Sequence, residues 1–125
     1  MKRLDVACKY PYVRHIAHPT GRIIGRRPGY KPNIEKLMKL AEETNTILEI
    51  NANPKRLDLN AETVRKYPNV KLTINTDAHH TNHLEFMKYG VATAQKGFVA
   101  KDRVVNALSR EEFKSLIENN IKLRK

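Results

Sequence analysis

The chain has 125 residues, and its 24 lysines and arginines exceed its 13 acidic residues by enough to give a formal net charge of +11. This length predicts one domain over residues 1–125 and is too short for a closed eightfold α/β barrel, which needs on the order of 200 residues or more. The chain has neither a membrane-length apolar run nor an apolar signal core, so we expect no membrane partner. Its single cysteine, Cys8, allows no internal disulfide, so we expect a cytoplasmic protein. The charge favours nucleic acid or another polyanion, with a lysine-rich surface as the alternative.

Strand-like segments alternate with amphipathic segments along the chain. In chain order we predict a strand at 12–18, a Gly- and Arg-rich loop at 19–30, a helix at 34–44, a strand at 46–51, a helix at 61–67, a strand at 70–75, a short helix at 82–88, a strand at 91–95, and helices at 101–108 and 110–122. Asn33 is a suitable N-cap, and Ser109 with Glu112 forms a capping box. The alternation predicts an α/β fold with about four parallel strands and flanking helices.

Polar side chains follow three of the predicted strands at their carboxyl ends. His18 follows the first strand, Asn51 and Asn53 end the second, and Asp77 and His79 follow the third. Ligands gather at the carboxyl ends of parallel strands, so we expect these residues to share one edge of the sheet. The sequence therefore predicts a candidate active site there.

Asp77 and His79 are the residues most suggestive of metal chemistry. A spacing of two places both side chains on one side of an extended backbone, and carboxylate oxygen with imidazole nitrogen suits zinc, manganese or iron. An Asx-turn with a partly exposed histidine explains the same spacing equally well. His80 and His83 enlarge the histidine cluster, although both suit a surface position.

His18 stands before a proline, Pro19, which we expect to hold it extended at the strand end. A hydrogen-bonded structural histidine is the alternative to a ligand at this position. His15 does not share its same-face spacing of two and is expected to be structural.

A carboxylate and three guanidinium groups complete the candidate site. Glu49 interrupts an apolar strand and must be paired if it is buried, either as a partner that orients a metal-bound histidine or as an ion-pair partner of Arg22. Arg22, Arg26 and Arg27 lie in the Gly-rich loop and could bind phosphate, or the loop could simply be basic and solvated.

Four blocks of sequence together resemble a known family. They are His18-Pro19-Thr20-Gly21-Arg22-Ile23-Ile24-Gly25-Arg26-Arg27, the run from Leu48 to Leu59, Ile74-Asn75-Thr76-Asp77-Ala78-His79, and Met87-Lys88-Tyr89-Gly90-Val91 with Thr93-Ala94-Gln95-Lys96-Gly97. In this order they resemble the C-terminal portion of the polymerase and histidinol phosphatase (PHP) domain of family X DNA polymerases.

The resemblance implies a partial (β/α)7 PHP barrel with manganese or zinc at its carboxyl rim, where phosphoesters are hydrolysed in 3′–5′ exonuclease and DNA-end processing reactions. Matched to the family pattern, His18, Asp77 and His79 fall on metal-ligand positions and so carry the implied catalytic role. Glu49 and Asn51 are expected to support these ligands, and Glu49 does not match the family's own ligand glutamate.

The chain lacks the family's N-terminal His-x-His motif and most of its other ligands. We therefore expect it to bind metal weakly or not at all alone, and to associate as a homodimer or with a companion chain that supplies the N-terminal half of the domain. The expected function is that of a fragment or split half of a metal-dependent phosphoesterase. The alternative is a non-catalytic module that binds nucleic acid or helps assemble a DNA-repair complex.

Overall fold

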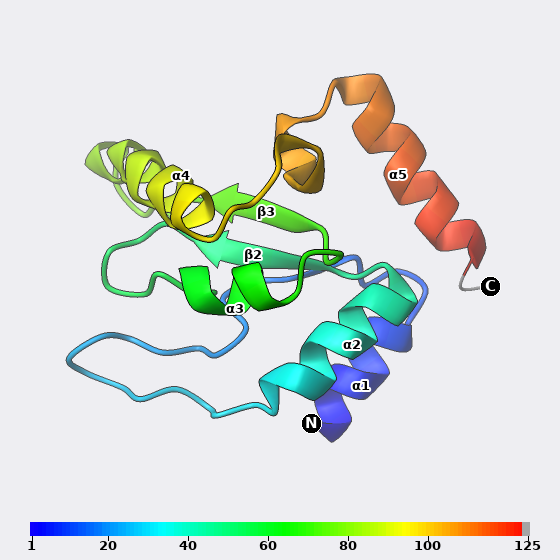
Figure 1. The fold of residues 1–125 in the computed structure, drawn as a ribbon, viewed down its shortest axis with the longest axis horizontal. Helices are drawn as coiled ribbons and strands as arrows, with labels where there is room; N and C mark the ends of the chain where they lie inside the picture. Colours follow the sequence, from blue (N-terminus) through cyan, green and yellow to red (C-terminus); the bar gives the residue numbers. More distant parts are fainter. Residues whose placement is uncertain (124–125) are drawn as a thin grey trace.

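A computed structural model describes residues 1–123 of the chain, which fold around a three-stranded parallel sheet (Figure 1). The strands are β1 (His15–Ile16), β2 (Ile47–Asn51) and β3 (Leu72–Asn75), in the order β1-β2-β3. The α/β class and the parallel sheet are confirmed. Three strands in an open sheet do not by themselves identify a barrel.

The α-helices are α1 (Lys2–Lys9), α2 (Ile34–Thr44), α3 (Ala61–Lys66), α4 (Met87–Lys96) and α5 (Arg110–Leu123), and the 3-10 helices are η1 (Thr81–Phe86), η2 (Lys101–Arg103) and η3 (Val105–Ala107). Figure 1 shows α1 and α2 side by side, with α4 beside β2 and β3. No helix in this described part of the chain is long and apolar enough to cross a membrane.

The two faces of the sheet differ in polarity. The parallel register pairs Leu48 with Leu72 and Glu49 with Thr73. Successive strand residues point to opposite faces, so one face is apolar and the other is polar. The apolar face joins the core formed with the helices, whose buried members are Cys8, Leu37, Met38, Leu40, Ala41, Leu48, Ile50, Ala52, Leu59, Val64, Val70, Leu72, Ile74 and Ala94. The polar face leads directly to the candidate site.

Both predicted helix caps are confirmed. The side chain of Asn33 accepts a hydrogen bond from the backbone N–H of Lys36 at 2.8 Å. At the start of α5, Glu112 accepts from the N–H of Ser109 at 2.8 Å, and the Ser109 hydroxyl accepts from the N–H of Glu112 at 3.2 Å. These bonds satisfy N–H groups that have no partner within the helix.

The predicted strand at 91–95 is wrong, because these residues lie in α4. Val91 and Thr93 suggested a strand, yet the residues that α4 buries are Gly90 and Ala94, four apart on one helical face. A Cβ on Gly90 would lie only 2.4 Å from Cγ2 of Ile74. The small residue therefore lets the helix approach the sheet closely, and the sheet has three strands in the described chain.

Four further boundaries differ from the predictions. The strand predicted at 70–75 begins only at Leu72. Within 12–18 only His15–Ile16 pairs as a strand. The short helix predicted at 82–88 is the 3-10 helix η1, which continues into α4. The helix predicted at 101–108 is two short 3-10 helices. The helices 34–44, 61–67 and 110–122 agree with the structure to within a residue.

The two edge strands of the sheet, β3 and β1, differ in their neighbours. The Asn106 side chain covers the β3 edge, accepting from the Ile74 N–H at 3.1 Å and donating to the Ile74 carbonyl at 2.8 Å. On its outer side β1 has no strand neighbour within residues 1–123. An edge strand without a strand neighbour is a place where another chain can pair.

Candidate metal and phosphate site

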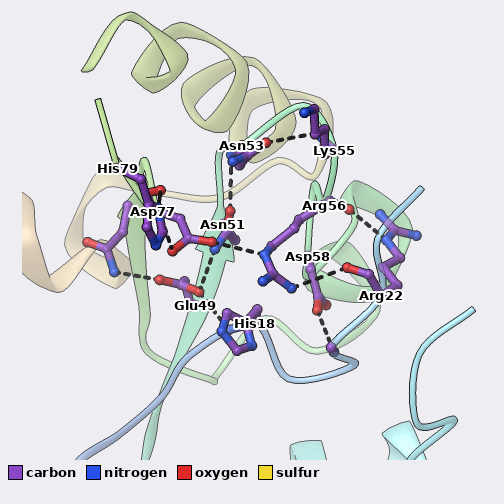
Figure 2. Close-up of polar contacts among 12 residues, drawn as sticks. His18, Arg22, Glu49, Asn51, Asn53, Lys55, Arg56, Asp58, Asp77 and His79 are labelled. Carbon is purple, nitrogen blue, oxygen red and sulfur yellow. Dashed lines mark hydrogen bonds and ion pairs between the residues drawn. The ribbon is translucent and has the colours of Figure 1, made fainter. Parts of the chain in front are cut away.

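The predicted site residues gather beyond the carboxyl end of the sheet (Figure 2). His18 follows β1, Asn51 ends β2, and Asp77 with His79 follows β3. In the view of Figure 2, Glu49 and Asn51 lie between His18 and the Asp77–His79 pair. Polar residues from three strand ends therefore lie at the same carboxyl edge of the sheet, as predicted.

Glu49 organises the polar face of the sheet and is only 4% exposed. Its carboxylate accepts from the backbone N–H of His18 at 2.6 Å, from Nδ2 of Asn75 at 3.0 Å and from Nδ2 of Asn51 at 3.2 Å. Charge-assisted bonds of this kind compensate the burial of a carboxylate. Glu49 therefore holds the His18 backbone through the amide. The expected alternative partner, Arg22, bonds elsewhere.

Two of the predicted ligands have backbone conformations that residues other than glycine rarely adopt. The φ angle is 30° at His18 and 55° at Asp77. The extended conformation expected before Pro19 is therefore not found. Each such residue costs on the order of 1–3 kcal/mol and persists only where its surroundings enforce it. At His18 the bond to Glu49 supplies that constraint.

Asp77 is fixed by an ion pair that the sequence did not reveal. Nε of Arg56 lies 2.9 Å from Oδ2 of Asp77. Nδ1 of His79 lies 2.7 Å from the Asp77 backbone carbonyl and 3.9 Å from Oδ1. The His79 side chain is 77% exposed. Asp77 thus presents one carboxylate oxygen to Arg56 and the other toward His79.

These residues fit only part of a metal site. A catalytic zinc takes about three protein ligands, and paired metal ions need more. Within residues 1–123 no group of three or more His, Cys, Asp or Glu residues is arranged to hold a metal ion. Asp77 and His79 come together, whereas His18 does not join them in a three-ligand cluster.

A buried carboxylate, Asp58, fastens the Gly-rich loop to the sheet. Its Oδ2 accepts from the Thr20 N–H at 3.0 Å, the Thr20 hydroxyl at 2.9 Å and the Gly21 N–H at 3.1 Å. Asp58 is 1% exposed. The turn that follows His18 is therefore held in place by three bonds to one oxygen.

The three loop arginines line one cavity of about 420 Å³, and two of them also donate hydrogen bonds to backbone carbonyls. Arg22 donates through Nε to the Arg56 carbonyl at 2.7 Å and through Nη2 to the Leu57 carbonyl. Arg27 donates to the Gly21 carbonyl at 3.0 Å, and its guanidinium lies 5.8 Å from the centre of the Tyr30 ring. Arg26 is exposed. Arg22 and Arg27 thus shape the loop, and phosphate binding by all three arginines stays a prediction.

Sequence reasoning missed Arg56, Asp58 and Asn75. Asp58 carries a recognisable signal, since it stands between Leu57 and Leu59 as Glu49 stands between two apolar residues. A carboxylate in such a setting must find partners when it is buried. The ion pair of Arg56 has no local signal, because Asp77 is 21 residues away.

His15 is a structural residue, as expected, and its burial makes the stability of the fold depend on pH. Its Nε2 lies 2.7 Å from Oγ1 of Thr73. Burial lowers the pKa of His15 from its ordinary value of 6.5, against the opposing charge of Glu49. Because the folded-state pKa is lower than the unfolded one, the neutral form stabilises the fold above pH 6.5, and this contribution is lost as pH falls below 6.5 toward the folded-state pKa.

Urea unfolding of the chain at pH 7.5 and pH 5.5 tests this. We expect His15→Gln to reduce the loss of stability between the two values, because the amide can still bond Thr73 without titrating. His80→Asn removes an exposed histidine and serves as the control. An equal pH dependence in wild type and His15→Gln contradicts the assignment.

The fold and the site define an α/β chain of the kind that binds ligands beyond the carboxyl ends of parallel strands. Over 122 residues, or 96% of its length, the chain is 48% identical to the DNA polymerase/3′-5′ exonuclease PolX of Bacillus subtilis (strain 168). This confirms the expected resemblance to a family X DNA polymerase. The chain spans 21% of the length of that relative. No protein-family model matches the chain.

Proposed function

We propose that this chain is one part of a metal-dependent phosphoesterase that removes nucleotides from DNA 3′ ends. The proposal rests on the arrangement of polar residues at the strand ends. Glu49 binds the backbone N–H of His18, and Arg56 binds the Asp77 carboxylate beside His79. The 48% identity to a relative named as a 3′-5′ exonuclease supports the substrate class. The net charge of +11 suits a polyanionic substrate.

His18, Asp77 and His79 would contribute ligands to manganese or zinc, with the missing ligands supplied from outside these residues. A bound divalent ion of this kind supplies activated water and neutralises phosphate charge. The chain's own residues do the positioning. Arg56 fixes the orientation of the Asp77 carboxylate, and the exposed Arg26 on the fastened loop could contact phosphate.

The missing ligands would come from a companion chain, or a second copy, seated along β1. The outer side of β1 has no strand neighbour among the described residues. Beside it, α1, β1 and Tyr30 border a cavity of about 610 Å³. The three guanidinium nitrogens of Arg14, next to β1, are inaccessible to water and have no hydrogen-bond partner within residues 1–123. A buried cation without an acceptor is costly, and a partner seated along β1 would supply one if the Arg14 side chain turned outward on binding.

The second candidate is a non-catalytic module that binds nucleic acid or helps assemble a repair complex. It is favoured by the absence of a three-ligand metal group among the residues described. It predicts DNA binding that weakens steeply with salt and does not depend on manganese.

The test is reconstitution of nuclease activity. The chain is mixed with the remaining portion of the B. subtilis relative, expressed separately, and the mixture is given a 3′-tailed DNA with and without manganese. We expect manganese-dependent shortening of the tail that neither part shows alone.

His79→Ala tests whether the candidate metal site is needed for the reconstituted nuclease activity. We expect it to lower the reconstituted rate by about 100-fold or more, since even groups that only orient metal ligands are worth 10- to 100-fold. Glu111→Ala, at an exposed residue in the first turn of α5, is the control and should keep the rate. A mixture that binds DNA but never cleaves it supports the non-catalytic module instead.

A further inference from the structure

Four aromatic rings line one side of the segment that follows the candidate site. They belong to His80, His83, Phe86 and Tyr89, which we call the ring row. The spacing of three is significant, because side chains at i and i+3 eclipse in a 3-10 helix, and η1 spans the first part of this segment. The start of α4 continues the alignment, since i and i+3 are also neighbours on an α-helix.

The rings succeed one another without a break. Ring centres are 6.0 Å apart between His80 and His83, 4.8 Å between His83 and Phe86, and 6.1 Å between Phe86 and Tyr89. The middle pair is stacked at 20°. Phe86 packs against the core and anchors the row, whereas Tyr89 is 41% exposed and His80 is also exposed. The row is therefore fixed at its middle and accessible at its ends.

One end of the ring row adjoins the candidate site. The backbone N–H of His79 donates to Nδ1 of His83 at 3.2 Å. Nδ1 of His80 accepts from the N–H of Asn82 at 3.2 Å, which caps η1 and fixes the first ring. A strand lying along the row would thus arrive beside Asp77 and His79.

The other end of the ring row is basic. Nζ of Lys88 lies 5.2 Å from the centre of the Tyr89 ring. Beyond Tyr89, the same side of α4 reaches a cavity of about 380 Å³ whose lining includes Arg22 and Lys96. Glu85 is the only acidic residue between positions 80 and 96. Cations beside exposed rings are the combination that binds single-stranded nucleic acid.

We propose that the ring row is a stacking platform for the unpaired bases of a nucleic-acid single strand. Rings offer a stacking surface to any base, but bases inside a duplex are already stacked and cannot use it. The platform therefore discriminates single strands from duplexes without reading sequence. Its role in leading a 3′ end to Asp77 and His79 rests on the proposed function, whereas its binding of single strands does not.

The test measures binding with a chelator present, so that no metal or cleavage is involved. The probes are a short oligothymidylate and a blunt duplex of the same length, titrated against the 125-residue chain. Tyr89→Leu removes a ring while keeping an apolar side chain, and His80→Asn removes a ring while keeping a residue suited to the cap. We expect each to weaken oligothymidylate binding by about tenfold, in keeping with the stacking of one base, and to leave duplex binding unchanged.

Two controls separate stacking from folding and from general surface effects. Tyr89→Phe keeps the ring and should bind as wild type. Phe113→Leu removes a ring of matched exposure, 42%, on α5 and should also have no effect. Circular dichroism of each variant checks that its helices are retained.

The results that would overturn the stacking platform differ from those that would overturn the proposed nuclease function. Unchanged oligothymidylate binding by Tyr89→Leu and His80→Asn overturns the platform but leaves the nuclease proposal standing, as does an equal loss on single strand and duplex. Loss of companion binding without loss of oligothymidylate binding identifies the ring row as a protein interface and also overturns the platform. A wild-type chain that binds neither probe overturns the platform, and failure of the reconstituted nuclease would separately reject the proposed function.

Discussion

Replacing Arg103 with alanine is expected to lower the free energy of unfolding by about 4 kcal/mol, since hydrogen bonds to charged groups contribute about 1.5–3 kcal/mol each. Arg103 is 8% exposed. Its guanidinium donates to the carbonyls of Tyr67 at 2.9 Å, Val70 at 3.2 Å and Val64 at 3.3 Å. Alanine leaves these carbonyls, in and after the last turn of α3, without their donor.

Urea denaturation followed by circular dichroism measures this loss. Arg110→Ala is the matched control, because Arg110 is exposed at the start of α5 and its removal should change stability by less than about 0.5 kcal/mol. Burial lowers the pKa of Arg103, yet an arginine stays charged at any working pH. The loss should therefore be the same at pH 6 and pH 8. A loss under about 1 kcal/mol would show that the guanidinium is not needed to satisfy these carbonyls.

Replacing Arg14 with methionine is expected to have the opposite sign and to raise the free energy of unfolding of the chain alone by about 2 kcal/mol. All three guanidinium nitrogens of Arg14 are buried without an acceptor among residues 1–123. Methionine keeps much of the apolar stem and removes the uncompensated charge. The measurement is thermal or urea unfolding of the isolated chain.

Arg14→Met also tests whether a companion chain binds beside β1. If a partner supplies the acceptor for Arg14, Arg14→Met should weaken association with the remaining portion of the relative while it stabilises the isolated chain. Arg26→Met, at an exposed arginine, should alter neither quantity. A destabilised isolated chain would show that Arg14 is already satisfied without a partner and would remove the main structural support for the companion.

Local sequence patterns predicted the parts of the fold that depend on neighbouring residues. The caps at Asn33 and Ser109 were predictable because the donor and acceptor lie three residues apart. The helix 34–44 was predictable because its apolar positions repeat at helical spacing. The strand predicted at 91–95 failed because β-branched Val91 and Thr93 outweighed Gly90 and Ala94. The packing of those two small residues against the sheet is visible only in three dimensions.

By itself, the sequence determined the α/β class, the order of strand ends that carry His18, Asn51, Asp77 and His79, and the family resemblance that identity to a relative then confirmed. Only the tertiary structure decided how these residues are held. The bonds from Arg56 to Asp77 and from the His18 amide to Glu49 join residues 21 and 31 positions apart. Such contacts arise when parallel strands align, and local spacing does not encode them. The meeting of Asp77 with His79, without His18 completing a group of three, is likewise a property of packing, because only the folded chain shows which candidate ligands come together.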